Sequence, residues 1–251
     1  MVREIRLIGV EGIPEVKKGD DVARLILSCA KQQGTPLSDD DILVVTQKIV
    51  SKSEGMVVNL SDISPTGFAE RVGQQLDKDP RLIEVILQQS RRIVRMDKGV
   101  LLAETKLGYV CANAGVDASN IPGEDTVCLL PERPDVSAKN IRDAIHESIG
   151  SWVAVLISDT FGRPWREGTT NIAIGVAGIN PLIDHKGVDD SFGRTLQFSV
   201  TALADELTGA SDLVADKIAN IPAVIIRGLT FDKDNDKSKF LIRDTQLDLF
   251  R

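Results

Sequence analysis

Two short segments of this chain each set one aspartate among small or apolar residues, with a second polar group close behind. In "CANAGVDASN", Asp117 is followed by Asn120, and in "VLISDTFGRPWREG", Asp159 is followed by Thr160. Carboxylates and hydroxyls are hard oxygen ligands of the kind that Mg²⁺ or Mn²⁺ prefers. An aspartate beside Gly, Ala or Ser also caps backbone amides in an ordinary turn. The two segments therefore indicate either a divalent-cation site or a pair of turns.

Two arginines accompany the second aspartate. We expect an apolar strand to end at residues 158–160 and one loop behind it to carry Arg163 and Arg166. Open α/β sheets bind ligands at the carboxyl ends of their strands, and the guanidinium fork matches phosphate or carboxylate. The alternative is that Asp159 caps a turn while the arginines pair with surface acids such as Glu167.

Two more segments could contribute to such a site. "VVTQKIVSKSEG" places Lys48 and Lys52, with several neutral donors, directly after a buried strand. "GVEGIPEVKKGDD" near the N-terminus is a glycine-proline loop whose backbone amides could approach a ligand closely. Lysines near a helix start are also commonly just solvated, so neither segment is decisive alone.

Composition excludes several classes of protein. The chain has 251 residues and a net charge of -7, so no global basic field attracts nucleic acid or a membrane surface. Nowhere do eighteen uncharged apolar residues run together, and we expect neither export nor a membrane span. Cys29, Cys111 and Cys128 are widely spaced in apolar stretches, as is typical of reduced core thiols in a cytoplasmic protein.

The familiar catalytic signatures are absent from the sequence. There is no phosphate-binding G-x-x-x-x-G-K-[ST] loop, no G-x-G-x-x-G after a strand, no G-x-S-x-G and no H-E-x-x-H. Only His146 and His185 are available, and His146 is expected on the solvated side of a helix. Histidine-based nucleophilic catalysis is therefore disfavoured. Carboxylates, lysines and arginines beside glycines suit metal-assisted phosphate chemistry.

Helical and extended segments alternate along the chain and must position these groups. Spacing and capping predict helices in residues 20–34, 64–76 with a Ser64 cap, 79–90, 137–150 with a Ser137 cap, and 195–219. Strands are predicted in residues 3–10, 41–46, 152–158, 171–178 and 221–228, with two or three more in residues 93–115 around turns at Lys98-Gly99 and Leu107-Gly108. This mixed order indicates one α+β or α/β domain over residues 1–251 with more than one sheet.

Taken together and in order, eight segments resemble the coenzyme F-420:gamma-glutamyl ligase family. They are "EGIP", "VVTQKIVSKSEG", "NAGVDASN", "SDTFGRPWREG", "NIAIGVAG", "FGRTL", "ALADEL" and "IPAVIIRGL", and they run from Glu11 to Leu229. Members of that family use GTP and a divalent cation to join L-glutamate to the lactyl carboxylate of the deazaflavin coenzyme F-420-0, and add further glutamates through gamma linkages. The resemblance implies an unusual α+β fold with two subdomains and an intertwined homodimer.

The resemblance also implies roles for individual residues. It implies two Mg²⁺ or Mn²⁺ ions per site, with K⁺ as a further candidate ion, held by Asp117, Asp159 and Thr160. Asp216 is a candidate ligand of the second metal, although residues 214–220 lack the glycines that relatives often carry there. Implied contacts to GTP are Glu11, Gly12, Ile13, Pro14, Gln47, Lys48, Lys52 and Asn120. Lys52, Arg163 and Arg166 are the implied catalytic cations. No C-terminal flavin-reductase-like extension is expected, so we predict ligase function alone.

Three functions remain open from the sequence. In the first, the F-420-0 carboxylate attacks the γ-phosphate of GTP, and glutamate displaces phosphate from the resulting acyl phosphate, because no histidine or cysteine is placed as a nucleophile. In the second, the same chemistry acts on another carboxylate acceptor. In the third, the protein is a catalytically degraded nucleotide-binding regulator. The retained Asp117, Asp159, Thr160, Arg163 and Lys52 favour an enzyme.

Overall fold

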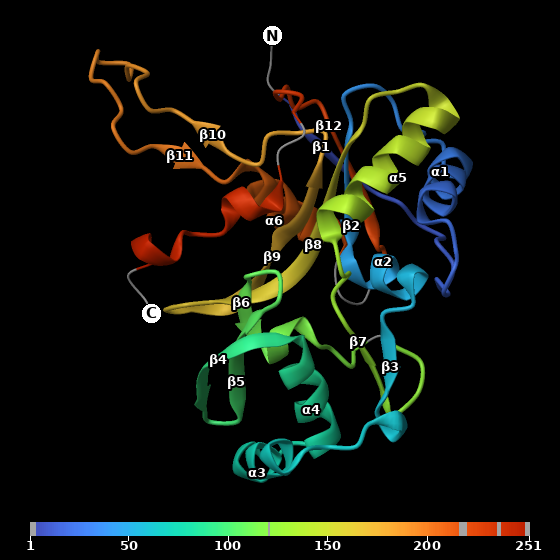
Figure 1. Cartoon of the computed structure of the whole chain (residues 1–251). Coiled ribbons are helices and arrows are strands. Elements are labelled where there is room, and N and C mark those ends of the chain that lie inside the picture. Colours follow the sequence, from blue (N-terminus) through green and yellow to red (C-terminus); the bar gives the residue numbers. More distant parts are fainter. Residues whose placement is uncertain (1–3, 120, 216–219, 235–236, 249–251) are drawn as a thin grey trace.

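A five-stranded sheet forms the centre of the computed structural model, which describes residues 4–119, 121–215, 220–234 and 237–248. Its strand order is β1-β12-β2-β8-β9 (Figure 1). The strands are β1 (Arg6–Gly9), β12 (Ala223–Arg227), β2 (Ile42–Thr46), β8 (Ala154–Arg163) and β9 (Arg166–Ala177). Strands β2 and β8 pair in parallel, and the other neighbours pair antiparallel. Helices and several sheets are mixed along the chain, as predicted for an α+β protein.

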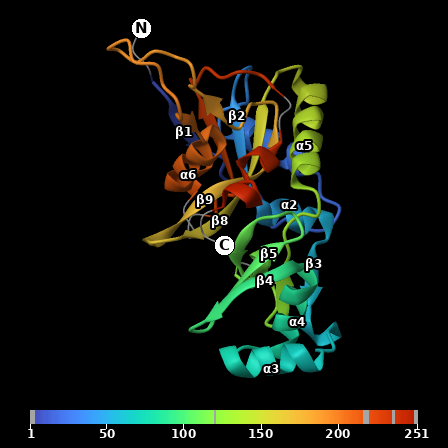
Figure 2. The same cartoon turned by 60° about the vertical axis from the view of Figure 1, so that its left-hand side comes forward.

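Helices cover both faces of this sheet. Successive side chains of a strand point to opposite faces, so Leu43 and Val45 join one buried cluster while Ile42 and Val44 join another. Helices α1 (Val22–Gln32) and α5 (Pro134–Ile149) pack in the first cluster, and α6 (Leu203–Ala215) packs in the second. Figure 2 shows α5 and α6 on opposite sides of the sheet. Burial on both faces explains the uninterrupted apolar runs of β2 and β8.

The segment between β2 and α5 builds a smaller part below the sheet in Figure 1. Strands β4 (Ser90–Asp97), β5 (Val100–Thr105) and β6 (Val110–Ala112) form one antiparallel sheet, and β3 (Val57–Asn59) pairs with β7 (Thr126–Cys128). Helices α3 (Gly67–Leu76) and α4 (Pro80–Gln89) contribute to the third buried cluster, with Ile83, Ile86 and Leu101 at its centre. The strands and turns predicted in residues 93–115 are confirmed. Short 3-10 turns are η1 (Leu60–Asp62), η2 (Asn113–Gly115), η3 (Ser238–Leu241) and η4 (Thr245–Leu247).

Helices α3 and α5 have other start residues than the sequence predicted, whereas α4 does not. Helix α4 begins as predicted, with Asp79 as its cap and Pro80 in the first turn. In α3 the cap is Thr66 rather than Ser64, because the Thr66 hydroxyl accepts the amide of Ala69. Helix α5 starts at Pro134, whose fixed φ suits a first turn, so the predicted cap residue lies inside the helix, with its hydroxyl bonded to Glu54.

The prediction of a continuous helix over residues 195–219 is wrong in its first part. Val200–Thr201 forms strand β11, which pairs with β10 (Ile183–Asp184) and makes an arm that projects from the body in Figure 1. Valine and threonine favour an extended backbone when a partner strand is present. Helix α6 begins only at Leu203, and residues 216–219 lie outside the described residues.

Strand β8 is longer than predicted. Its parallel pairing with β2 ends at Thr46 and Ser158, but β8 continues with β9 as a hairpin to the pair formed by Arg163 and Arg166. The expected single loop behind Ser158 is therefore a strand, a tight turn and a second strand. Asp159 still stands directly beyond the carboxyl end of β2. In the described part of the chain no helix is long and apolar enough to cross a membrane.

Candidate active site

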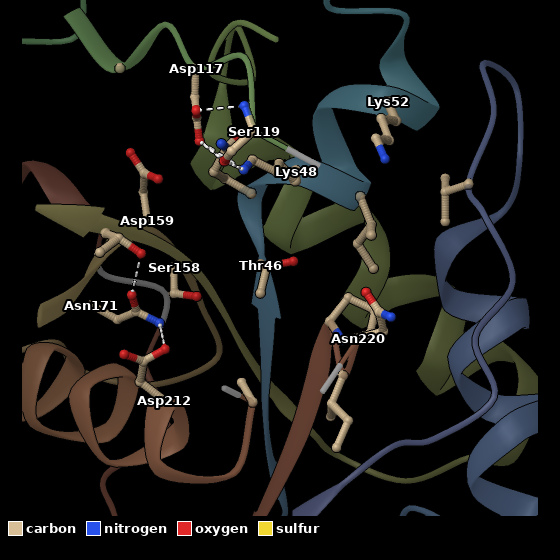
Figure 3. Close-up of a pocket in the computed structure, with 18 of the residues that line it drawn as sticks. Thr46, Lys48, Lys52, Asp117, Ser119, Ser158, Asp159, Asn171, Asp212 and Asn220 are labelled. Carbon is tan, nitrogen blue, oxygen red and sulfur yellow. Dashed lines mark hydrogen bonds and ion pairs between the residues drawn. The ribbon is translucent and has the colours of Figure 1, made fainter. Parts of the chain in front are cut away.

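A cavity of about 720 Å³ lies where β2 and β8 end their parallel pairing. Helix α2 (Gln47–Glu54), which follows β2 without a linker, forms one wall, and α6 forms another (Figure 3). Further lining residues come from the 13–16 loop, the 112–119 segment, the β8–β9 hairpin and residues 220–222. Segments far apart in the sequence thus meet around one polar cavity.

Asp117 is held on one side of this cavity by a lysine and a serine. Its carboxylate lies 2.7 Å from the Lys48 ammonium and accepts the Ser119 amide and hydroxyl at 2.8 and 2.7 Å. The Lys48 Nζ atom also donates to the Ser119 hydroxyl at 2.6 Å. Burial alone would raise the pKa of Asp117, but the hydrogen bonds from Lys48 and Ser119 outweigh it and leave the pKa below its usual value. Asp117 is therefore ionised at neutral pH.

Asp159 faces the same cavity in a different environment. Burial raises the pKa of this carboxyl to about 7, and the negative charge of Asp117 adds to the shift. Hydrogen bonds from the Thr160 amide and the Gln47 side chain, together with the charge of Lys48, act in the opposite direction. A divalent cation between the two aspartates would remove their mutual repulsion and favour the ionised form of Asp159.

A chain of hydrogen bonds links the hairpin to helix α6 below these carboxylates. The Thr160 hydroxyl donates to the Asn171 side-chain oxygen at 2.7 Å, and the Asn171 side-chain nitrogen donates to an Asp212 oxygen at 3.1 Å. Asn171 is buried, with 5% of its surface exposed. All three residues line the cavity, and Figure 3 shows Asn171 beside Asp212.

A second lysine approaches from helix α2. Lys52 is buried, and its ammonium lies 2.6 Å from a carboxylate oxygen of Glu15 in the N-terminal loop. Both residues line the cavity. Gly55 ends α2 in the left-handed conformation, with φ of 74°, so the helix stops one turn after Lys52. The cavity therefore contains two ammonium groups, each of which lies beside a carboxylate.

The donor set fits a hard divalent cation. Asp117, Asp159 and the Thr160 hydroxyl supply oxygen atoms, and the Lys48 ammonium shows that the Asp117 carboxylate accepts a cationic partner. Among the described residues no group of three His, Cys, Asp or Glu side chains converges. Mg²⁺ commonly binds through one or two carboxylates and takes its other ligands from water and substrate phosphates. Two aspartates therefore suffice when a nucleotide is the co-ligand.

The structure brings most of the sequence-predicted site residues together, but not all of them. Arg163 and Arg166 lie at the exposed tip of the β8–β9 hairpin, outside the cavity lining, where Arg163 donates to the Glu167 backbone oxygen at 2.8 Å. Asn120 and Asp216 lie outside the described residues. The predicted residues that do line the cavity are Ile13, Pro14, Gln47, Lys48, Lys52, Asp117, Asp159 and Thr160, whereas Glu11 and Gly12 are exposed in the same N-terminal loop.

The cavity lining also includes residues that were not predicted, among them Glu15, Ser119, Asn171 and Asp212. Glu15 and Ser119 lie beside predicted residues, so proximity in sequence was the available signal. In the sequence, Asn171 is a polar residue at the start of an apolar strand, and Asp212 lies on the polar face of a helix. Asp212 carries no local motif, and Asn171 stands only as the first residue of the segment "NIAIGVAG", so it is the folded chain that brings both to Thr160.

A comparison with known families decides what kind of protein carries this cavity. The model of the F420-0:Gamma-glutamyl ligase family matches residues 12–228. The chain belongs to the F420-0:gamma-glutamyl ligase family. This match confirms the resemblance inferred from the eight sequence segments, and it includes every cavity-lining part described above.

Full-length relatives in this ligase family are named coenzyme F420:L-glutamate ligase. The Methanothermobacter thermautotrophicus protein is 44% identical over 250 residues, which cover 98% of this chain and 99% of the relative. The Methanopyrus kandleri protein is 40% identical, with 96% and 97% covered. The Methanocaldococcus jannaschii protein is also 40% identical, with 99% and 98% covered. Similarity extends along both chains in each case, and these relatives are ligases by name.

Proposed function

We propose that this protein is a GTP-dependent ligase that joins L-glutamate to the lactyl carboxylate of coenzyme F-420-0 through an amide bond. The reaction belongs to coenzyme F-420 biosynthesis, and further glutamates are added through gamma linkages. The observation that carries the proposal is the cavity itself, where Asp117 and Asp159 stand beside Lys48 and Lys52. Membership of the ligase family and the names of the full-length relatives support the choice of substrates.

Residues from several walls of the cavity have roles in this proposal. Asp117, Asp159 and Thr160 would hold Mg²⁺ or Mn²⁺, which would offset the charge of the phosphates and polarise the γ-phosphate. Lys48 and Lys52 bind phosphate oxygens of GTP, together with backbone groups of the 13–14 loop and the Gln47 amide. Gln47 is buried and accepts the Ser51 hydroxyl at 2.9 Å, which holds it at the cavity wall.

The proposed reaction path has two steps. The acceptor carboxylate attacks the γ-phosphorus, the bond to the β,γ-bridging oxygen breaks, and GDP leaves from an acyl phosphate. The glutamate amine then attacks the acyl carbon, loses a proton and expels inorganic phosphate. The chain contributes positioning and positive charge rather than a covalent nucleophile. Lys52 offsets the charge that grows on GDP.

Arg163 and Arg166 have a more distant role in the proposal. A strand rises about 3.3 Å per residue, so the hairpin tip stands roughly 13 Å beyond Asp159. The acceptor is an elongated phosphodiester, and its phosphate and ring system must extend away from the reacting carboxylate. Guanidinium groups at the tip are suited to that phosphodiester.

Metal binding should depend on pH because of Asp159. Its pKa is about 7, so the carboxyl must lose a proton before it binds a cation, whereas Asp117 is already ionised. We expect the affinity of the nucleotide-free protein for Mn²⁺ to be about tenfold weaker at pH 6 than at pH 8, as titration calorimetry would measure. An affinity that is constant over this range would show that Asp159 does not bind the ion.

We also propose a homodimer, on the basis of the arm that carries β10 and β11. Phe192 and Phe198 are 88% and 91% exposed there, which is unfavourable for a free monomer. The wild-type protein should sediment as a dimer at micromolar concentration, and a double Phe192→Ser, Phe198→Ser variant should sediment as a monomer. Leu247→Ser removes an exposed side chain elsewhere, is the control, and should leave the dimer intact. A monomeric wild-type protein, or an unaffected double variant, would contradict this assembly.

One experiment tests the proposed function as a whole. The protein is incubated with GTP, Mn²⁺, L-glutamate and glutamate-free coenzyme F-420-0, and the products are weighed by mass spectrometry. We expect a coenzyme product heavier by one or more glutamyl residues, with GDP and phosphate. Product formation with another carboxylate acceptor but not with F-420-0 would support a different amide ligase, and nucleotide binding without turnover would support a regulatory protein.

A further inference from the structure

In the described part of the chain, the cavity lining has two carboxylates that the proposed metal and nucleotide contacts leave unused, and of these Glu15 is ion-paired with Lys52 whereas Asp212 is not. It projects from α6 and lines the cavity together with Asp159 and Thr160 (Figure 3). Among the described residues it receives one hydrogen bond, from Asn171, and forms no ion pair. Because it does not gather with two other acidic side chains of the described chain, it is not part of a three-carboxylate metal cluster.

The orientation of the Asn171 side-chain amide is set by its two hydrogen-bond partners, Thr160 and Asp212. A carboxylate only accepts hydrogen bonds, so the Asn171 nitrogen donates to Asp212 at 3.1 Å, which leaves the Asn171 oxygen to accept the Thr160 hydroxyl at 2.7 Å. Asn171 is 5% exposed and therefore held rigidly by its surroundings. One oxygen of Asp212 is thereby anchored, and the carboxylate is oriented at the cavity wall before any ligand arrives.

The charge of the cavity suggests what Asp212 binds. Lys48 and Lys52 serve anionic ligands, and a nucleotide and a carboxylate acceptor bring no positive group. The incoming amino acid is the substrate with a cationic ammonium. A carboxylate that accepts hydrogen bonds from that ammonium is both charged and directional, and such bonds are about twice as strong as neutral ones.

The position of Asp212 agrees with an amine close to the reacting carbon. Two hydrogen bonds lead from Asp212 to Thr160, which is the chain neighbour of Asp159. The attacking amine must reach the acyl carbon beside the γ-phosphate, near that metal-binding aspartate. A guanine base lies beyond a triphosphate and a ribose, so it belongs at the far end of the nucleotide from this point.

We propose that Asp212, oriented by Asn171, binds the α-ammonium group of the incoming amino acid and holds its nitrogen near the acyl carbon, which the nitrogen attacks after the ammonium has lost a proton to solvent. This inference rests on the proposed ligase function and adds a residue for the amine substrate to it. Asn171 is the positioning residue, and Asp212 is the group that touches the substrate.

The Asp212→Asn variant tests this assignment. The amide keeps the size of the side chain and an oxygen that can accept from Asn171, while the charge is lost. We expect the KM for L-glutamate to rise about 10- to 100-fold, with KM values for GTP and for the acceptor within about twofold of wild type. Glu206→Gln is the matched control, because it removes one negative charge from an exposed position of the same helix, and its KM for glutamate should not change.

A second substrate separates amine binding from a general defect. Hydroxylamine is uncharged at neutral pH and traps acyl phosphates as hydroxamates, with release of phosphate. Asp212→Asn should form hydroxamate from GTP and F-420-0 at a rate within about twofold of wild type. Asp212→Glu, which keeps the charge one methylene further out, should recover part of the affinity for glutamate.

The outcomes distinguish this inference from the proposed function. If the wild-type protein makes no product from GTP, glutamate and F-420-0, the proposed function fails. If the wild-type protein is active but the variant has an unchanged KM for glutamate, the role of Asp212 is refuted. An increased KM for GTP, or a raised Mn²⁺ requirement, would assign Asp212 to the nucleotide or to a metal ion and would overturn the amine site as well.

Discussion

Asp159→Asn should reduce turnover by at least about 10³-fold while the protein still folds. Losing one transition-state hydrogen-bond donor commonly costs about 10² to 10³ in rate, and this substitution removes a charged ligand of the proposed cation. The change preserves the shape of the side chain, so it tests charge rather than packing. Glu167→Gln, which removes a negative charge from an exposed position of the same hairpin, should retain normal turnover.

The same variant should be more stable than wild type in metal-free buffer. The native pKa of Asp159 is about 7, and an unfolded aspartate titrates near about 3.9. Between these values the native state binds more protons than the unfolded state, so the wild-type free energy of unfolding falls as pH rises. We expect the variant to melt at a higher temperature than wild type at pH 8 and at a similar temperature at pH 4. Near-wild-type activity, or a loss of stability at pH 8, would contradict the two-aspartate site.

Lys52→Ala should lower turnover by about 10² to 10³ because it removes a buried ammonium of the cavity lining, which the proposed reaction path places beside the leaving GDP. The partner carboxylate of Glu15 is 56% exposed, so water can solvate it when the lysine is lost, and we expect only a modest change in melting temperature. Steady-state rates and thermal unfolding measure the two effects separately.

Lys17→Ala provides the matched comparison for that variant. Lys17 is exposed in the same N-terminal loop and does not line the cavity, so its removal changes the net charge equally without touching the site. Its turnover should equal that of wild type. If Lys52→Ala retained activity within about tenfold of wild type, the role of Lys52 in offsetting charge on GDP would be refuted.

Local signals in the sequence were sufficient for the regular elements of the main sheet. Asp79 and Pro80 predicted the start of α4, and the apolar runs of β2 and β8 predicted buried strands. The arm was missed because residues 195–202 contain no motif that separates strand from helix, and the pairing of β11 depends on β10, which is distant in sequence. The length of β8 was missed for a different reason: its outer half pairs with β9 alone, and this segment was expected to be a loop.

The site was predictable where functional residues share a segment with glycines or with each other. Asp117, Asp159, Lys48 and Lys52 stood out by type and spacing, and the fold places all four around one cavity. The link from Thr160 through Asn171 to Asp212 could not be predicted, because it joins a hairpin to a helix and depends on tertiary contacts between side chains far apart in the sequence. Arg163 and Arg166 were close to Asp159 in sequence, but an extended hairpin carries them away from it.

The central claim is that the acceptor carboxylate is activated as an acyl phosphate. Transfer of an oxygen atom from that carboxylate to inorganic phosphate tests it most directly. F-420-0 with both oxygens of its lactyl carboxylate replaced by oxygen-18 is incubated with the protein, GTP, Mn²⁺ and L-glutamate, and the products are analysed by mass spectrometry. An acyl-phosphate path retains one labelled oxygen in the amide carbonyl and transfers the other to inorganic phosphate, with GDP as the second product. Unlabelled phosphate, with the second label in GMP or in water, would show that the carboxylate is activated in another way and would contradict the proposed roles of Lys52 and the metal-binding aspartates.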